Sequence, residues 1–296
     1  QDHWEKFNAL GVSQYGQMTA GSYMYIGPQG IVHGTTITIL NAGRRLKRED
    51  SGQKLLFVSS GLGGMSGAQP KAGNIAKVIS VIAEVNPRAI HTRFTQGWVD
   101  EVFEDMNLLV KRVREAKERN ESVSLAYHGN IVDLWERFAD EELWADLGSD
   151  QTSLHNIDDL GYCPVGYTFE EAKSLLSKNK ERFMTEVRKS LKRHVKAINT
   201  LSERGMYFWD YGNAFLKEAG LAGANIWKDK KQTGYRYPSY VEDIMGPMCF
   251  DYGFGPFRWV CLSGSEQDLY TTDDIALKVL KKLHDKAPDE IRGQLR

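Results

Sequence analysis

The chain has 296 residues and a mass of 33.5 kDa, and 41% of its residues are hydrophobic and 26% charged, which is ordinary for a globular protein with one large or two modest cores. Its 38 basic and 39 acidic residues leave a formal net charge of −1, so charge gives no case for a nucleic-acid partner or an anionic membrane surface. No apolar run approaches the length of a membrane span, and the N-terminus lacks the pattern of a secretory signal. We expect a cytoplasmic protein.

Three cysteines, Cys163, Cys249 and Cys261, are scattered along the chain without the spacing of a metal site. We expect free, mostly buried thiols that serve packing, and no bound metal. The chain starts without Met and stops in a charged, helix-like stretch at 289–292. We therefore expect it to be a fragment of a longer protein.

Two stretches near the start, 15–22 and 25–34, combine aromatic residues with glycine. This glycine content disfavours a regular element throughout, and we predict loops that face a ligand. A helix over 31–45 is expected to follow them.

A glycine-rich loop follows the first predicted strand. An apolar run predicts a strand at 54–59, and Gly61-Leu62-Gly63-Gly64-Met65-Ser66-Gly67 leads from it into a helix-like segment. A strand that turns through glycines into a helix points backbone N–H groups at one spot, which is a site for pyrophosphate. The alternative is a loop whose glycines only permit a tight turn.

An acidic residue lies at the distance that a dinucleotide site requires. The second predicted strand, 79–84, ends at Glu84, which is 20 residues beyond Gly64. A carboxylate at this spacing binds the ribose hydroxyls and favours NAD over its 2′-phosphorylated relative. The strand before the loop, the helix after it and this acid together favour a bound NAD over a simple turn.

Strand-like and helix-like segments alternate along the chain to residue 210. Short apolar runs predict strands at 122–127, 143–148 and 206–210, and a helical pattern covers 98–119. Strands that alternate with helices form a parallel sheet covered on both faces. We therefore predict an α/β fold with a Rossmann-like parallel sheet.

Two helices are expected between the last two of these strands. Thr168 and Glu171 have the spacing of a capping box, and a long helix over 180–204 would stop at Gly205. The apolar residues of the long helix recur on one face; they are Phe183, Val187, Leu191, Val195, Ile198 and Leu201.

Polar side chains follow three of the predicted strands. They lie in the segments 127–130, 148–155 and 210–213. Any one of them is explained by local loop capping. Because ligands of a parallel sheet bind beyond the carboxyl ends of its strands, the three segments together favour a ligand site.

The C-terminal part differs in character from the alternating region. A polar segment at 228–236 predicts an exposed loop, and we place a domain boundary near residue 237. Beyond it, the segment 253–259 sets Arg258 among aromatic residues and glycines. A partly desolvated guanidinium there would bind a planar anion such as a carboxylate, or would form a cation–π or ion pair in a packed corner.

Six segments resemble one known family when taken in order: 15–35 (YGQMTAGSYMYIGPQGIVHGT), 61–72 (GLGGMSGAQPKA), 127–130 (YHGN), 149–155 (SDQTSLH), 208–215 (FWDYGNAF) and 253–264 (GFGPFRWVCLSG). The family is urocanase, also called urocanate hydratase, and the resemblance runs from about residue 8 to about residue 275. It implies an NAD-binding Rossmann-like domain over 27–237. Partial core segments at 1–26 and 238–296 would flank this domain.

The resemblance also implies a reaction and a site. Urocanase adds water to urocanate in histidine breakdown to give imidazolone propionate, and tightly held NAD acts as an electrophile without net hydride transfer. Arg258 would anchor the urocanate carboxylate, with Thr19 and Ser22 as further substrate contacts, and a homodimer is expected. NAD would be bound by Gln17, Gly64, Met65, Ser66, Glu84, Asn130, Ile131, Gln151, Thr152, Ser153, Leu154, His155, Tyr162, Cys163 and Tyr211.

The chain departs from the family pattern in two respects. Where the family often has an arginine shortly after the ribose acid, this chain has Ala89, with Arg88 one place earlier. The family's chain also extends beyond both ends of this one, and neither Cys249 nor Cys261 lies in the context of its C-terminal cysteine. Two alternatives therefore stay open: an NAD-binding module that is inactive because it is truncated, and an ordinary NAD-dependent dehydrogenase.

Overall fold

The computed structural model describes residues 6, 10, 29–46, 52–255 and 261–295. The described residues of 31–255 form one compact unit, and those of 261–295 belong to a second unit that is described separately. The first unit contains a six-stranded sheet. Its strands are β1 (Leu56–Ser60), β2 (Ile79–Glu84), β3 (Glu101–Phe103), β4 (Val123–His128), β5 (Leu147–Asp150) and β6 (Tyr207–Asp210).

All paired strands of the sheet run parallel, in the order β3-β4-β2-β1-β5-β6. From β1 the chain forms β2, then the edge strand β3, then β4 between β2 and β3, and finally β5 on the other side of β1. The strand order therefore reverses at β1, between β2 and β5. The carboxyl ends of the strands at such a switch point are where open α/β sheets bind ligands. The predicted α/β fold with a parallel sheet is confirmed.

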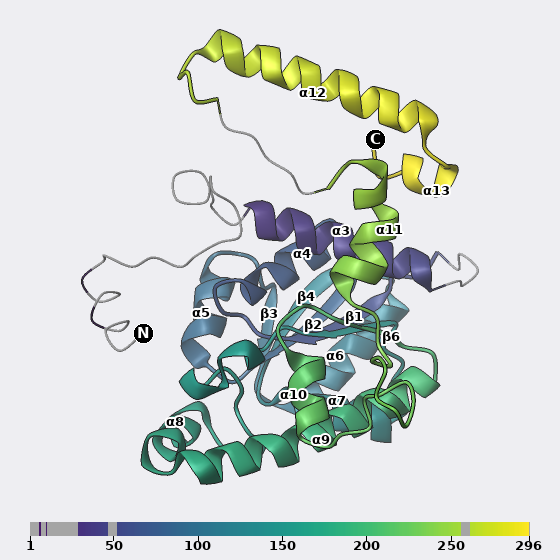
Figure 1. The fold of residues 1–296 in the computed structure, drawn as a ribbon. Coiled ribbons are helices and arrows are strands. Elements are labelled where there is room, and N and C mark those ends of the chain that lie inside the picture. Colours follow the sequence, from purple (N-terminus) through teal and green to yellow (C-terminus); the bar gives the residue numbers. More distant parts are fainter. Residues whose placement is uncertain (1–5, 7–9, 11–28, 47–51, 256–260, 296) are drawn as a thin grey trace. The chain divides into compact units, whose positions relative to one another are not determined.

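Helices and single helical turns connect the strands and cover both faces of the sheet (Figure 1). The first unit contains α3 (Gln29–Arg45), η1 (Ser66–Ala68), α4 (Gln69–Ile75), α5 (Pro87–Thr95), α6 (Met106–Glu118), α7 (Ile131–Asp140), η2 (Leu154–Asp159), α8 (Phe169–Lys178), α9 (Lys180–Glu203), α10 (Phe215–Leu221), η3 (Tyr240–Met245), α11 (Gly246–Met248) and η4 (Phe250–Tyr252).

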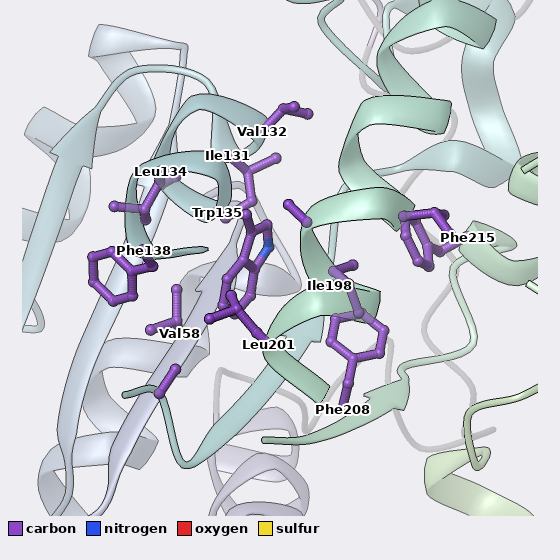
Figure 2. Close-up of a cluster of buried hydrophobic side chains, with 14 of the residues drawn as sticks. Val58, Ile131, Val132, Leu134, Trp135, Phe138, Ile198, Leu201, Phe208 and Phe215 are labelled. Carbon is purple, nitrogen blue, oxygen red and sulfur yellow. The ribbon is translucent and has the colours of Figure 1, made fainter. Parts of the chain in front are cut away.

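The larger core lies between the sheet and the helices α6, α7, α9 and α10. Strand residues that point to this face, such as Val58 and Val81, are fully buried. Figure 2 shows the Trp135 indole of α7 among side chains that include Val58 and Leu201. Burying a side chain of this size contributes about 1.5 to 3 kcal/mol, so α7 is held firmly against the sheet.

The opposite face of the sheet forms a smaller core with α3, α4, α5 and η3. Phe57 of β1 points to this side and stacks on Trp209 of β6, with ring centroids 5.5 Å apart. Successive strand residues thus face different cores, which is the period of two expected of a strand. Because both faces are covered, the strands are buried runs rather than alternating apolar and polar sequences.

Several local predictions are confirmed. Thr168 and Glu171 form the capping box of α8, and α9 ends at Glu203, close to the predicted stop at Gly205. The six apolar residues predicted to share a face of α9 are all buried. The loop at 228–236 is largely exposed as expected.

Three element predictions are corrected. The predicted helix over 98–119 contains the edge strand β3 at its start, and α6 begins only at Met106, after Asp105 caps it. The strand predicted at 143–148 lies at 147–150, and just before it the Trp144 indole donates a hydrogen bond to the Asp146 carboxylate. The helix predicted over 31–45 starts at Gln29, so part of the predicted glycine-rich loop at 25–34 is helical.

The second unit contains α12 (Glu266–Lys286) and α13 (Asp289–Arg292). Ser265 caps α12 by accepting a hydrogen bond from the backbone N–H of Asp268. Among the helices that the structure describes, none combines the length and apolarity needed to cross a membrane.

Candidate functional site

The glycine loop follows β1 at the switch point of the sheet. Gly61 has a φ of +93° and donates its N–H to the Ala83 carbonyl of β2 at 2.8 Å. This φ lies in the region that side chains rarely adopt, so the turn requires glycine here. The buried Gln69 side chain donates to the carbonyl oxygens of Ser60 and Gly61 at 2.8 and 3.1 Å and so stabilises the turn.

The loop beyond this turn presents backbone donors. Within the described residues, no protein acceptor is found for the backbone N–H groups of Gly64, Met65 and Ser66. A Cβ added at Gly64 would meet nothing within 4 Å, so the space next to this residue is open. Consecutive unpaired N–H groups in an open loop form a cradle for phosphate oxygens.

Glu84 ends β2 and is bonded to the loop. One oxygen of its carboxylate accepts the backbone N–H of Leu62 at 2.7 Å, and the other accepts that of Asn86 at 2.8 Å. Burial raises the pKa of Glu84 above its ordinary value, and these N–H groups oppose the rise. The predicted ribose acid therefore lies against the predicted phosphate loop.

Asp150 joins three strand ends. Its carboxylate accepts the Ser60 hydroxyl from β1 at 2.6 Å, the Thr152 hydroxyl at 2.6 Å and the Asn213 amide beyond β6 at 2.7 Å. The side chain is 1% exposed. Hydrogen bonds to a buried carboxylate are strong, so they fix the loops after β1, β5 and β6 relative to one another.

Unpaired polar atoms lie next to this cluster. Gln151 Nε2 and the Tyr211 hydroxyl are buried, and neither has a hydrogen-bond partner of good geometry within the described part of the chain. The Tyr211 ring stacks on Tyr240 with centroids 4.8 Å apart, and burial raises the pKa of Tyr211 to about 12. The side chains of Thr35, Thr38 and Gln151 lie near the Tyr211 hydroxyl and oppose this rise in pKa. A polar ligand would give both buried atoms better-aligned partners.

Asn130 connects β4 and α7 to a distant segment. Its side chain caps α7 by accepting the Val132 N–H and donates to the Cys163 carbonyl at 2.9 Å. The structure thus places Asn130 at the start of α7 beside Cys163, and the predicted cofactor contacts of Asn130, Ile131, Tyr162 and Cys163 stay predictions.

Several predicted contacts have side chains that point into the core. Leu154 is 1% exposed, and Tyr162 is buried with its hydroxyl 3.2 Å from His194 Nδ1. The Cys163 thiol contacts the Tyr167 carbonyl at 3.4 Å, and burial raises its pKa to about 12. These residues offer a ligand only their backbone groups, whereas Ser153 and His155 are exposed.

The remaining predictions have mixed outcomes. Gln17, Thr19, Ser22 and Arg258 lie outside the described residues, so their predicted roles stay predictions. Cys163 and Cys249 are buried and form no disulfide bond, as expected, whereas Cys261 is only half-buried. Within the described ranges no cluster of residues has the composition of a metal site.

Arg93 is a residue of this site that was not predicted from the sequence. Its guanidinium, on α5, donates to the carbonyl oxygens of Leu62 and Gly63 in the glycine loop. An arginine nine residues after Glu84 in an amphipathic helix looks like a surface residue. The position of Arg93 in the sequence gives no sign of its contact with the glycine loop.

Comparison with known proteins settles the family. Residues 27–244 match the urocanase Rossmann-like domain, 1–24 the urocanase N-terminal domain and 247–289 the urocanase C-terminal domain. The chain belongs to the urocanase family. It is 52% identical over 295 residues to the probable urocanate hydratase of Caenorhabditis elegans and 55% identical over 285 and 288 residues to the urocanate hydratases of Mus musculus and Homo sapiens.

These matches cover 98% of this urocanase chain for the C. elegans protein and 94% for the mouse and human proteins. They cover 44%, 42% and 42% of the relatives themselves. The chain therefore spans less than half the length of the urocanate hydratases that it matches.

Proposed function

We propose that this chain is the cofactor-binding part of a urocanate hydratase, which adds water to urocanate to give imidazolone propionate in histidine catabolism. The observation that carries the proposal is the glycine loop with its unpaired N–H groups, bonded to the carboxylate of Glu84. It occurs in a chain 52–55% identical to urocanate hydratases. NAD is the proposed cofactor.

The residues at the switch point fit NAD. The N–H groups of Gly64, Met65 and Ser66 would bind the pyrophosphate, and Glu84 would accept the ribose hydroxyls. Gln151 Nε2 and the Tyr211 hydroxyl, both buried without a well-aligned hydrogen-bond partner, would gain better-aligned hydrogen bonds from the same ligand. The remaining cofactor contacts are proposed at Gln17, Asn130–Ile131, Thr152–His155 and Tyr162–Cys163.

Bound NAD would supply a positively charged ring that withdraws electrons from the substrate's imidazole. The contribution of this chain's own residues is to hold the cofactor and to orient the substrate. The loop and Glu84 would bind the cofactor, and Asp150 fixes the loops after β1, β5 and β6 relative to one another. Arg258 is proposed to bind the urocanate carboxylate, with Thr19 and Ser22 beside it. A homodimer in the cytoplasm is proposed on the family resemblance.

The proposal is tested by incubating urocanate with the full-length protein and with this chain alone. Urocanate absorbance and nicotinamide absorbance are followed together. A urocanate hydratase consumes urocanate and leaves the nicotinamide absorbance unchanged.

The two alternatives give different results. An NAD-dependent dehydrogenase changes the nicotinamide absorbance during turnover, and this would overturn the proposal. If the full-length protein consumes urocanate while this chain alone binds NAD and leaves urocanate intact, the chain is a cofactor-binding module that needs the rest of the protein.

A further inference from the structure

Arg93 lies on the last turn of α5 and contacts the glycine loop. Its Nε donates to the Leu62 carbonyl at 3.2 Å and its Nη2 to the Gly63 carbonyl at 2.6 Å, while Nη1 donates to the Gln96 side chain at 2.7 Å. The guanidinium also lies over the Trp98 ring, 5.2 Å from its centroid. Four contacts therefore fix its position.

The two carbonyl contacts determine how the loop presents its N–H groups. In a trans peptide the C=O and the N–H point in opposite directions, and no cis peptide occurs in the described residues. Because the Gly63 carbonyl points at Arg93, the N–H of Gly64 points away from it. Arg93 thus orients the peptide whose N–H is the first of the three unpaired donors.

The charge of Arg93 is not balanced by a carboxylate. Among the residues that the structure describes, no acidic side chain forms an ion pair with it, and its partners are carbonyl oxygens, an amide oxygen and an indole. Partial burial lowers its pKa, but a guanidinium stays charged at neutral pH. A half-buried positive charge behind a phosphate loop attracts an anion in front of it.

Gly67 leaves the room that the guanidinium occupies. A Cβ at Gly67 would overlap Nε and Cζ of Arg93, although the φ of Gly67 is not in the positive region. The glycine at this position is therefore required by the close approach of Arg93 and not by its backbone conformation. Gly67 and Arg93 therefore depend on each other: the missing side chain of Gly67 leaves the space that the Arg93 guanidinium fills.

We propose that Arg93 is a positioning residue for the pyrophosphate of the cofactor: it fixes the Leu62 and Gly63 peptide planes and adds uncompensated positive charge behind the loop. The inference rests on the proposed NAD site. It goes beyond that site because Arg93 is placed on the side of the loop away from the Gly64 N–H.

The test measures binding of NAD, ADP-ribose and adenosine to the chain and to Arg93→Gln. NAD and ADP-ribose carry the pyrophosphate, and adenosine does not. Removing a charge-assisted interaction predicts about tenfold to a hundredfold weaker binding of the first two, with adenosine changed by less than about twofold. Arg93→Lys keeps the positive charge but lacks the planar guanidinium that bonds two carbonyl oxygens. Its affinity for NAD is expected to lie between those of the unchanged chain and Arg93→Gln. Arg188→Gln, at an exposed position of α9, is the matched control.

Gly67→Ala provides an independent test, because it displaces the guanidinium without removing it. It is expected to weaken NAD binding in the otherwise unchanged chain and to have little further effect in Arg93→Gln, where the space is free. If Arg93→Gln does not fold, Gly67→Ala in the otherwise unchanged chain still tests the proposal, because weaker NAD binding with unchanged adenosine binding supports it and unchanged NAD binding overturns it.

The results separate this inference from the proposed function. If the unchanged chain does not bind NAD, the proposed cofactor site is wrong. If the chain binds NAD and Arg93→Gln binds it equally tightly, or if adenosine binding falls by the same factor, the role of Arg93 is overturned while the cofactor site stands.

Discussion

At the scale of single residues, Glu84 makes the sharpest prediction. Its two carboxylate oxygens accept the backbone N–H groups of Leu62 and Asn86. A glutamine at this position would place its NH2 group against one of these N–H donors. Glu84→Gln is expected to weaken NAD binding by about 1.5 to 3 kcal/mol, the range for hydrogen bonds to a charged group. It should also reduce discrimination against the 2′-phosphorylated cofactor. Isothermal titration calorimetry measures both.

The control for Glu84 is Glu118→Gln, at an exposed position of α6. It removes the same charge from the chain far from the loop. Equal NAD affinities for the two variants would show that Glu84 does not contact the ribose.

His194 predicts a pH dependence of stability. It is fully buried between Tyr162 and Phe215, and burial lowers its pKa to about 4 against the opposing charges of Asp150 and Glu136. The unfolded chain therefore binds the proton first, and stability contributed by neutral His194 is lost as the pH falls from about 6.5 toward 4. Between pH 7 and pH 5 the loss is about 2 kcal/mol.

Urea unfolding at the two pH values tests this against His194→Gln. Both proteins carry the same carboxylates, so the difference between their pH dependences reports His194. The unchanged chain should lose about 2 kcal/mol more than the variant. Identical pH dependences would show that His194 titrates near its ordinary pKa in the fold.

At the scale of elements, Asp150 determines how the strand ends meet. Asp150→Ala leaves the Asn213 amide and the Thr152 and Ser60 hydroxyls without their shared acceptor. Leaving such buried donors unpaired is expected to lower the free energy of unfolding by about 2 to 4 kcal/mol. Thermal unfolding measures the change. Asp140→Ala, at an exposed position at the end of α7, should have an effect near zero, and a similar effect of both variants would contradict the role given to Asp150.

The elements that the sequence did not reveal are those that depend on distant partners. β3 has three residues, too few for a periodic signal. It pairs in parallel with β4 at the edge of the sheet, and Arg112 of α6 bonds its Glu101 at 2.8 Å. Local composition predicts a helix for these residues, whereas pairing with the distant strand β4 makes them a strand.

At the scale of the whole molecule, the parts that could be predicted are those encoded by short spacings. The glycine loop and Glu84 lie within one strand-helix-strand unit, so their relation follows from the sequence alone. Asp150 and Asn213, or Arg93 and Gly67, meet only because of the strand order and helix packing. Their roles could not be found without the fold.

The most direct test of the account is native mass spectrometry of the dialysed chain before and after addition of NAD, together with analysis of any small molecule released on denaturation. The account predicts one NAD for each chain, present from the start or taken up on addition, and a lower occupancy in Glu84→Gln. A chain that carries no NAD and forms no complex with added NAD would contradict it.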